Sequence, residues 1–283
     1  MEILVAKSAG FCFGVEKAIE SVYKEIETGK KPIYTFGPII HNEQVVEDLE
    51  EKGVSVIDTI EKLENLQSGC VVIRSHGVPK KIYDAIEKQN LEIVDATCPF
   101  VKKIHNIVRK ESEKGKRIVI IGNDNHPEVE GIKGWVVGEA IVIKDEEDIK
   151  KIDSFRNESI CIVSQTTFNY NKFKYLVEII TKKGYDINVV NTICNATHLR
   201  QVEAKEIASK VDAMIVIGGK NSSNTQKLYD ICKNECKDTY YIQTVSNLNL
   251  KNVDSLRSIG ITAGASTPKK IIEEVVLNVR DEF

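Results

Sequence analysis

The sequence has no hydrophobic run close to the roughly 20 apolar residues that a membrane-spanning helix needs. Its 39 lysines and arginines do not outnumber its 42 acidic residues, so the chain has no overall positive charge for binding nucleic acid. The first five residues have neither the basic region nor the cleavage site of a signal peptide. We therefore expect a cytoplasmic protein that binds neither membranes nor nucleic acid.

Short cysteine pairs of the C-x₂-C type are also absent, although the chain has seven cysteines. An odd number at scattered positions in a cytoplasmic protein argues against a disulfide framework. A structural zinc site would usually take four ligands from such pairs. We therefore expect the cysteines to be buried thiols or metal ligands drawn from distant segments.

Short apolar segments alternate with amphipathic helical patterns along the chain, which is typical of parallel α/β proteins. Twelve strands are expected, in three blocks of similar order: 33–36, 54–57, 71–74 and 91–94; 118–121, 140–143, 161–163 and 187–190; 213–217, 240–242, 259–262 and 3–5. The N-terminal strand completes the third block. The pattern predicts an α/β fold of three units related by pseudo-threefold symmetry, each with a four-stranded, mainly parallel sheet. The expected units are residues 14–97, residues 98–193, and residues 1–13 together with 194–283.

One cysteine follows the last strand of each block, at Cys98, Cys194 and Cys12. Cys98 directly precedes Pro99 at the start of a predicted helix, where the helix dipole favours a thiolate. Ligands of parallel sheets bind beyond the carboxyl ends of the strands, so the expected symmetry would bring the three thiols together at the centre. Three cysteines can hold a [4Fe–4S] cluster and leave one iron open as a Lewis acid, which predicts catalysis rather than simple electron transfer.

The other cysteines and two histidines are expected to be structural. Cys70 and Cys161 flank or begin equivalent predicted strands, which favours buried apolar roles. Cys232 and Cys236 are four residues apart on one predicted helix and could pair on a metal, but no histidine or cysteine cluster nearby supports this alternative. His105 and His198 lie within the helices that follow two of the candidate ligands, and we expect neither to bind metal.

Polar loops follow other strands and precede helices, where backbone amides and the helix dipole bind anions. The candidate anion-binding residues are His41, His76, His126, Thr166, Ser222, Ser223, Asn224 and Ser266. Helix capping is an alternative role for the hydroxyl and amide side chains, and capping or a surface position is the alternative for the histidines. Neither a Walker A sequence nor a G-x-G-x-x-G motif occurs, so we expect a phosphate or diphosphate rather than a nucleotide.

Glu128 is the one carboxylate inside a polar loop beside a candidate anion-binding histidine, His126. A solvated surface glutamate is the alternative interpretation. Burial would raise the pKa of Glu128 and allow it to donate a proton near neutral pH. Thr166, in the adjacent loop of the same predicted unit, could orient the carboxyl or relay the proton.

The motifs in combination resemble those of the 4-hydroxy-3-methylbut-2-enyl diphosphate reductases, or LytB family, over essentially the whole chain. The matching segments are AGFCFGV at 9–15, RSHG at 74–77, DATCP at 95–99, HPE at 126–128, SQTT at 164–167, KNSSN at 220–224 and TAGAS at 262–266. The resemblance implies reductive dehydroxylation of an allylic diphosphate to isopentenyl and dimethylallyl diphosphate, the last step of the methylerythritol phosphate pathway.

The resemblance also implies a role for each candidate residue. Cys12, Cys98 and Cys194 would hold a [4Fe–4S] cluster. Glu128 would donate a proton, with Thr166 near the substrate hydroxyl. The diphosphate would contact His41, His76, His126, Ser222, Ser223, Asn224 and Ser266, and His126 would also help to deliver protons. Since the chain shows no flavin or nicotinamide motif, a ferredoxin or flavodoxin would supply the electrons.

Two other classes of protein would also use three cysteines. A [4Fe–4S] dehydratase or a quinolinate-synthase-like enzyme would need carboxylate-binding groups, typically arginine, where this chain offers histidine, serine and asparagine. An iron–sulfur sensor would usually carry a nucleic-acid-binding segment or a basic surface, and neither is visible in the sequence.

Overall fold

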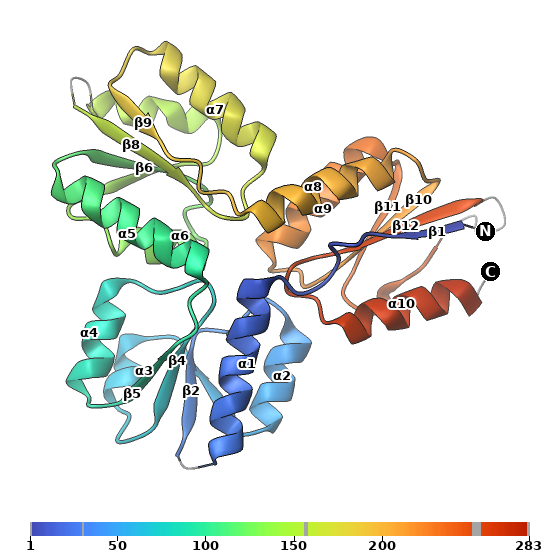
Figure 1. Cartoon of the computed structure of the whole chain (residues 1–283), viewed down its shortest axis with the longest axis horizontal. Helices are drawn as coiled ribbons and strands as arrows, with labels where there is room; N and C mark the ends of the chain where they lie inside the picture. The colour runs from blue at the N-terminus through green and yellow to red at the C-terminus, as the bar shows by residue number, and fades with distance from the viewer. Residues whose placement is uncertain (1, 30, 156–157, 251–255, 282–283) are drawn as a thin grey trace. The chain divides into compact units, whose positions relative to one another are not determined.

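The computed structural model describes residues 2–29, 31–155, 158–250 and 256–281. Within these ranges twelve strands alternate with helices (Figure 1). The strands are β1 (Glu2–Val5), β2 (Ile33–Phe36), β3 (Val54–Ile57), β4 (Cys70–Ile73), β5 (Glu92–Asp95), β6 (Arg117–Ile121), β7 (Ala140–Ile143), β8 (Ile160–Ser164), β9 (Ile187–Val189), β10 (Ala213–Ile217), β11 (Asp238–Ile242) and β12 (Ser258–Ala263).

The helices connect the strands in the manner of parallel α/β proteins. They are α1 (Phe13–Thr28), α2 (Glu43–Glu51), α3 (Ile60–Glu64), α4 (Lys80–Lys88), α5 (Pro99–Glu113), α6 (Pro127–Lys133), α7 (Tyr170–Lys182), α8 (Asn195–Ala208), α9 (Ser223–Glu235) and α10 (Lys269–Asp281), with 3₁₀ helices η1 (Glu146–Phe155) and η2 (Val245–Asn247). Within the same described ranges, no helix combines the length and the apolar character that crossing a membrane requires.

The strands form three four-stranded sheets, ordered β1-β12-β10-β11, β3-β2-β4-β5 and β7-β6-β8-β9. Every strand pair is parallel. In Figure 1, β1 in blue lies beside β12 in red, although they come from opposite ends of the chain. The prediction of an α/β fold with three four-stranded parallel sheets, one completed by the N-terminal strand, is confirmed.

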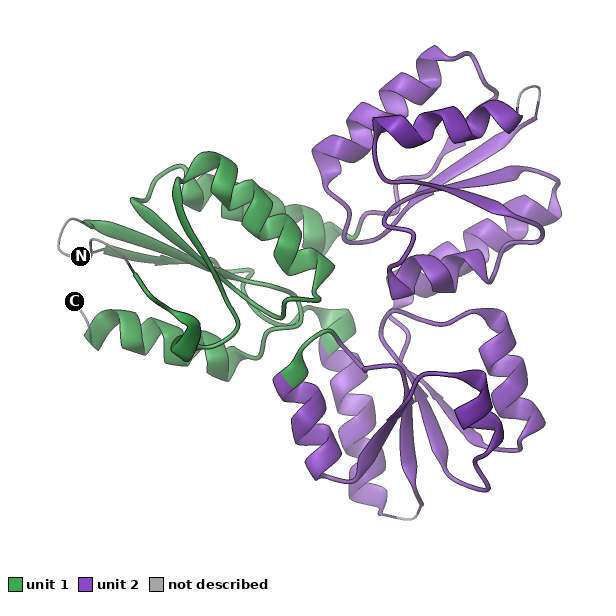
Figure 2. Cartoon of the chain, turned by 180° about the vertical axis from the view of Figure 1, so that it is seen from behind, with its two compact units in different colours: residues 1–15, 41–43, 194–283 green, residues 16–40, 44–193 purple. Residues whose placement is uncertain are grey.

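The chain divides into two compact units (Figure 2). The first contains residues 1–15, 41–43 and 194–283 and holds the β1-β12-β10-β11 sheet. The second contains residues 16–40 and 44–193 and holds the other two sheets. The division into three symmetric units remains a prediction.

The central strands of the three sheets are largely buried, because helices cover both faces of parallel sheets. Along β10, Ile215 and Ile217 pack with the apolar residues of α10. The intervening Met214 and Val216 pack with α8 and α9 on the opposite face. Strand β6 of the second unit alternates between two clusters in the same way. This burial holds the strands rigid, so the loops at their carboxyl ends have defined positions.

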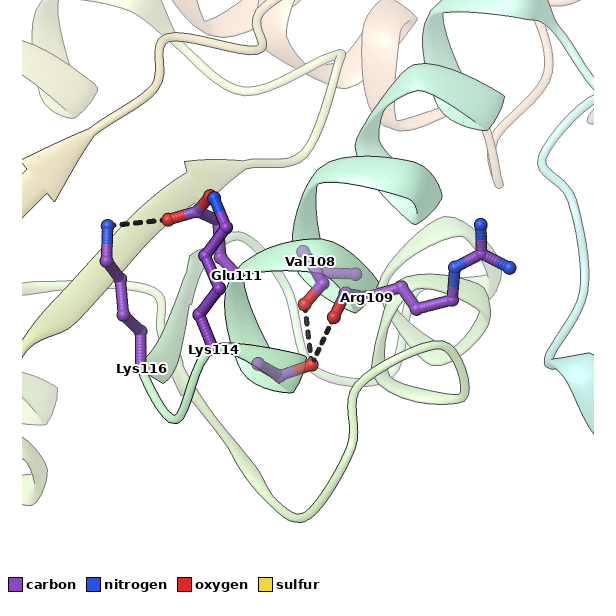
Figure 3. Close-up of polar contacts among 6 residues, drawn as sticks. Val108, Arg109, Glu111, Lys114 and Lys116 are labelled. Atoms are coloured by element: carbon purple, nitrogen blue, oxygen red, sulfur yellow. Dashed lines mark hydrogen bonds and ion pairs between the residues drawn. The ribbon is translucent and has the colours of Figure 1, made fainter.

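Helix α5 is stabilised near its carboxyl end by hydrogen bonds to the carbonyl oxygens of Val108 and Arg109 (Figure 3). The Oγ of Ser112 donates to the carbonyl oxygens of Val108 at 2.7 Å and Arg109 at 3.0 Å. The same oxygen accepts a hydrogen bond from the Val137 amide at 3.0 Å. The carboxyl end of α5 is therefore tied to the loop that follows α6, while one of the candidate site cysteines directly precedes its first turn.

The four cysteines that we expected to be structural are all buried. One detail of that prediction is wrong, because α9 ends at Glu235 and Cys236 lies just beyond it, outside the helix that carries Cys232. Cys236 has an extended backbone conformation. Its thiol lies 3.5 Å from the carbonyl oxygen of Asp212. The two thiols belong to the apolar core of the first unit.

Candidate functional site

A buried carboxyl group lies at the start of α6 in the second unit. His126 precedes the helix and caps it, since its Nδ1 accepts a hydrogen bond from the Glu128 amide at 3.1 Å. The Glu128 side chain is only 2% exposed. Thr166, from the loop after β8, donates its amide to one carboxyl oxygen and its hydroxyl to the other, each at 2.6 Å. Both oxygens of Glu128 are thus held by one residue of the neighbouring loop.

The surroundings of Glu128 change its acidity. Burial raises the pKa of Glu128 to about 7, although the hydrogen bonds from Thr166 act in the opposite direction. Removing a carboxylate from water disfavours its charged form, and here this effect outweighs two favourable hydrogen bonds. A carboxyl group with this pKa can give up and regain a proton at neutral pH.

Gln165 links two loops near Glu128, a contact that the sequence did not predict. Its side chain accepts a hydrogen bond from the Asn123 amide at 3.1 Å and donates one to Thr167 at 2.9 Å. Its own amide donates to the carbonyl oxygen of Ile121 at 2.9 Å. Gln165 therefore ties the loop after β6 to the loop after β8. Its position in the SQTT segment was the only signal, because glutamine has no chemistry that marks it as functional.

Two further candidates of the second unit, His76 and Cys98, lie on loops that are joined by a hydrogen bond. The ring of His76, after β4, meets the ring of His126 edge to face, with centroids 5.5 Å apart. The Cys98 amide donates to the carbonyl oxygen of Ser75 at 3.0 Å, so the cysteine is tied to the histidine loop. Cys98 is half-buried and directly precedes α5.

His105 packs against the loop that carries His76 and against Trp135. It is 3% exposed, and its ring stacks on Trp135 with centroids 5.3 Å apart. Burial lowers the pKa of His105 to about 4, so the ring is neutral at pH 7. Gly77 has a positive φ of 71°, and a Cβ there would lie 2.7 Å from His105. The histidine loop therefore depends on glycine at this position.

The first unit collects the other candidate anion-binding residues. Ser222 caps α9, accepting a hydrogen bond from the Thr225 amide at 3.3 Å, and Ser223 is the first helical residue. The capping role considered for Ser222 therefore applies. From the loop after β12, Ser266 donates its hydroxyl to the carbonyl oxygen of His41 at 3.0 Å. Three loops of this unit thus present polar groups around the start of one helix.

Asn224 stands out in the first turn of α9. It is 4% exposed, yet its amide oxygen and nitrogen have no hydrogen-bond partner in the part of the chain that the structure describes. A buried polar group without a partner costs about 1–3 kcal/mol. Such a residue at a helix N-terminus is suited to a bound anion, whose oxygens would accept from the amide nitrogen.

Cys12 and Cys194 also lie in the first unit, and each directly precedes a helix, α1 or α8. Both are half-buried, and both interact electrostatically with Arg200. All seven cysteines fall within the described ranges, and none forms a disulfide. Only Cys12, Cys98 and Cys194 are partly exposed, and all three precede helices. Partly exposed thiols at helix starts are typical of metal ligands and reactive groups rather than of structural cysteines.

The fold and these side chains define a class of protein, a parallel α/β protein with three partly exposed thiols at helix starts and a buried acid at the start of α6. A family model described as LytB protein matches residues 3–280, and the chain belongs to this family. Membership of the family implies an iron–sulfur cofactor.

Two relatives of similar length carry the same name. The 4-hydroxy-3-methylbut-2-enyl diphosphate reductase of Thermoanaerobacter sp. (strain X514) is 49% identical over 282 residues, covering 99% of this chain and 97% of the relative. The protein of that name from Clostridioides difficile (strain 630) is 46% identical over 276 residues, covering 98% of each chain.

Two solved structures share the fold. The E-1-hydroxy-2-methyl-but-2-enyl-4-diphosphate reductase of Plasmodium falciparum has a TM-score of 0.92 at 29% identity, covering 98% of this chain and 87% of that one. A second structure, of (E)-4-hydroxy-3-methyl-but-2-enyl diphosphate reductase, the terminal enzyme of the non-mevalonate pathway, has a TM-score of 0.72 at 40% identity and covers 99% of this chain and all of the other.

Proposed function

We propose that this chain reduces (E)-4-hydroxy-3-methylbut-2-enyl diphosphate to isopentenyl and dimethylallyl diphosphate, the terminal step of the non-mevalonate isoprenoid pathway. The reaction consumes two electrons and two protons, breaks the allylic C–O bond, forms a C–H bond and releases water. The electrons come from an external one-electron donor, a ferredoxin or flavodoxin. The reaction class follows from the family relationship, while the residues described above supply the proton and the anion site.

The observation that carries this proposal is the buried pair of Glu128 and Thr166. Loss of a hydroxyl group as water requires a proton, because hydroxide is a poor leaving group. Glu128 holds such a proton at neutral pH and is protected from solvent. Thr166 fixes both carboxyl oxygens, so the acid has one orientation toward the substrate hydroxyl.

The remaining candidates divide between the cofactor and the diphosphate. Cys12, Cys98 and Cys194 are proposed to hold a [4Fe–4S] cluster, which when bound supplies the electrons and a Lewis-acidic iron. The diphosphate is proposed to bind at the N-terminus of α9 and at the loops that carry the three candidate histidines. The residues proposed to contact it are His41, His76, His126, Ser222, Ser223, Asn224 and Ser266. Holding the diphosphate orients the allylic end and lowers the entropic part of the barrier.

The test of this function is turnover by anaerobically purified protein. Iron and sulfide are quantified first, and the hydroxylated diphosphate is then supplied with a reduced one-electron donor. Formation of the two isoprenoid diphosphates supports the proposal. A protein that holds a full cluster but consumes no substrate overturns it, and loss of water without electron consumption would instead indicate a dehydratase.

Turnover is expected to fall as the pH rises through about 7, the pKa of Glu128. The carboxyl group must be protonated to act as an acid, so activity is retained below this pH and falls by about tenfold per pH unit well above it. Single-turnover rates of pre-reduced protein, measured from about pH 6 to about pH 9, exclude effects on the donor. A rate that stays constant over this range would contradict the assignment.

Replacing Asn224 by leucine is expected to make the ligand-free protein more stable but to weaken its binding of inorganic diphosphate. Leucine removes the unpartnered amide, so the ligand-free protein gains about 1 kcal/mol in free energy of unfolding. Binding of inorganic diphosphate weakens by about tenfold or more, because a donor to the anion is lost. Urea unfolding and titration calorimetry measure the two effects. Asn234→Leu, at an exposed position of the same helix, is the control and leaves binding unchanged.

A further inference from the structure

Helix α8 begins directly after Cys194, and its Arg200 side chain reaches back to the segment that leads to Cys12. Arg200 is 3% exposed. Its Nε donates to the carbonyl oxygen of Ser8 at 2.8 Å, and its Nη2 donates both to that oxygen and to the carbonyl oxygen of Gly10 at 2.7 Å. One guanidinium therefore holds two carbonyl groups of the chain just before Cys12.

Glu203, one turn further along α8, holds the amide groups of the same segment. Its carboxylate accepts hydrogen bonds from the Lys7 amide at 2.8 Å and the Ser8 amide at 2.9 Å, and another from the Ser8 hydroxyl. Residues three apart share one face of a helix. Arg200 and Glu203 therefore grip both the carbonyl and the amide side of Ser8, a contact that we call the α8 clamp.

Two observations connect Arg200 to the cysteines themselves. Burial lowers the pKa of Arg200, and its electrostatic interactions with the side chains of Cys12, Cys194 and Glu203 act in the opposite direction, so the guanidinium lies within electrostatic reach of both cysteines. In addition, Nη1 is buried and finds no hydrogen-bond partner among the described residues. Buried N–H groups are nearly always paired, so an unpartnered one on this side chain is suited to an anionic group bound nearby.

We propose that Arg200 is a positioning residue for the iron–sulfur cluster, which sets Cys12 relative to Cys194 through the α8 clamp and places a positive charge beside the reduced cluster. This inference rests on the proposed cofactor. The clamp acts before the cluster binds, because it orders the Cys12 segment in the ligand-free chain. The charge acts afterwards, because each added electron makes the cluster more negative and a nearby cation favours that state.

The two effects separate in two substitutions. Arg200→Lys keeps the charge but loses the fork that holds two carbonyl groups, so the cluster is expected to be lost faster to a chelator at a nearly unchanged midpoint potential. Arg200→Met loses both, so faster loss is accompanied by a shift of the midpoint potential to more negative values. Loss of a residue that supports metal ligands typically costs about 10–100-fold in affinity or activity.

The experiment uses anaerobically purified holoprotein and measures iron and sulfide content, the rate of cluster loss to a chelator, the electron paramagnetic resonance spectrum of the reduced cluster and its midpoint potential. Glu206→Gln is the matched control, because Glu206 lies on the same helix in an exposed ion pair with Lys210. It is expected to match the wild type in every readout.

Wild-type chelator resistance and midpoint potential in both Arg200 variants would overturn the inference. If Arg200→Met does not fold, Arg200→Lys and Glu203→Gln decide, since each weakens one side of the clamp; unchanged cluster retention in both would refute it. A wild-type protein that holds no cluster at all would instead overturn the proposed function, so the two failures are distinguishable.

Discussion

Cys98→Ser protein is expected to be purified with little or no iron–sulfur cluster. The cysteine directly precedes α5 and is tied by its amide to the loop of His76, so its position does not depend on the cluster. A serine hydroxyl fits the same space but is not deprotonated at neutral pH, and it replaces the soft thiolate that iron–sulfur clusters require. Turnover is expected to be lost with the cluster. Iron and sulfide analysis and the visible absorption spectrum measure the first effect directly.

The chain offers a matched control for this substitution. Cys236 is a buried thiol that contacts the carbonyl oxygens of Asp212 and Asp238, with which a serine hydroxyl can also bond. Cys236→Ser is therefore expected to fold and to retain the full cluster. Wild-type iron and sulfide content in Cys98→Ser protein would remove Cys98 from the proposed ligand set.

Glu128→Gln protein is expected to bind the cluster and the substrate normally but to lose about 10²–10⁴-fold in turnover, the usual contribution of a general acid. Glutamine has nearly the same shape, and its amide oxygen can accept the hydrogen bond that the Thr166 amide now donates to Glu128. Thr166 can turn its hydroxyl to accept from the new amide nitrogen. The site thus keeps its geometry and loses only the transferable proton.

Two measurements make this prediction specific. Cluster content and the dissociation constant for the substrate show that the site is intact, and single-turnover rates of pre-reduced protein report the chemical step. Glu130→Gln, at an exposed position of the same helix, is the control and is expected to leave turnover unchanged. Glu128→Gln protein that keeps more than about a tenth of the wild-type rate would refute the role of Glu128 as proton donor.

The sheets could be predicted because their signal is local. Strand β2 is observed at Ile33–Phe36, where a short apolar run bounded by polar residues predicted it, and β3 and β7 also agree. The placement of β1 beside β12 could be predicted as well, because the third block lacked its last strand and the N-terminal segment supplied one. Both inferences depend on periodicity and order, which survive in the linear sequence.

The environments of the site residues could not be predicted in this way. The contact between Glu128 and Thr166 joins residues 38 apart, and the contact between Arg200 and Ser8 joins residues 192 apart. Neither has a local pattern, because each depends on which loops the folded sheets place together. For the same reason the sequence did not indicate Gln165 or Arg200, and it left open whether His126 caps a helix or binds an anion.

The sequence by itself determined the three parallel sheets, the three cysteines at helix starts and the glutamate beside a histidine. Each follows from residue type and spacing, which act over one strand or one turn of helix. Only the tertiary structure decided that Glu128 is buried with a pKa of about 7, that Asn224 has no hydrogen-bond partner among the described residues, and that Arg200 grips the segment before Cys12. Desolvation and hydrogen bonding depend on every element packed around a group, so they exist only once the chain has folded.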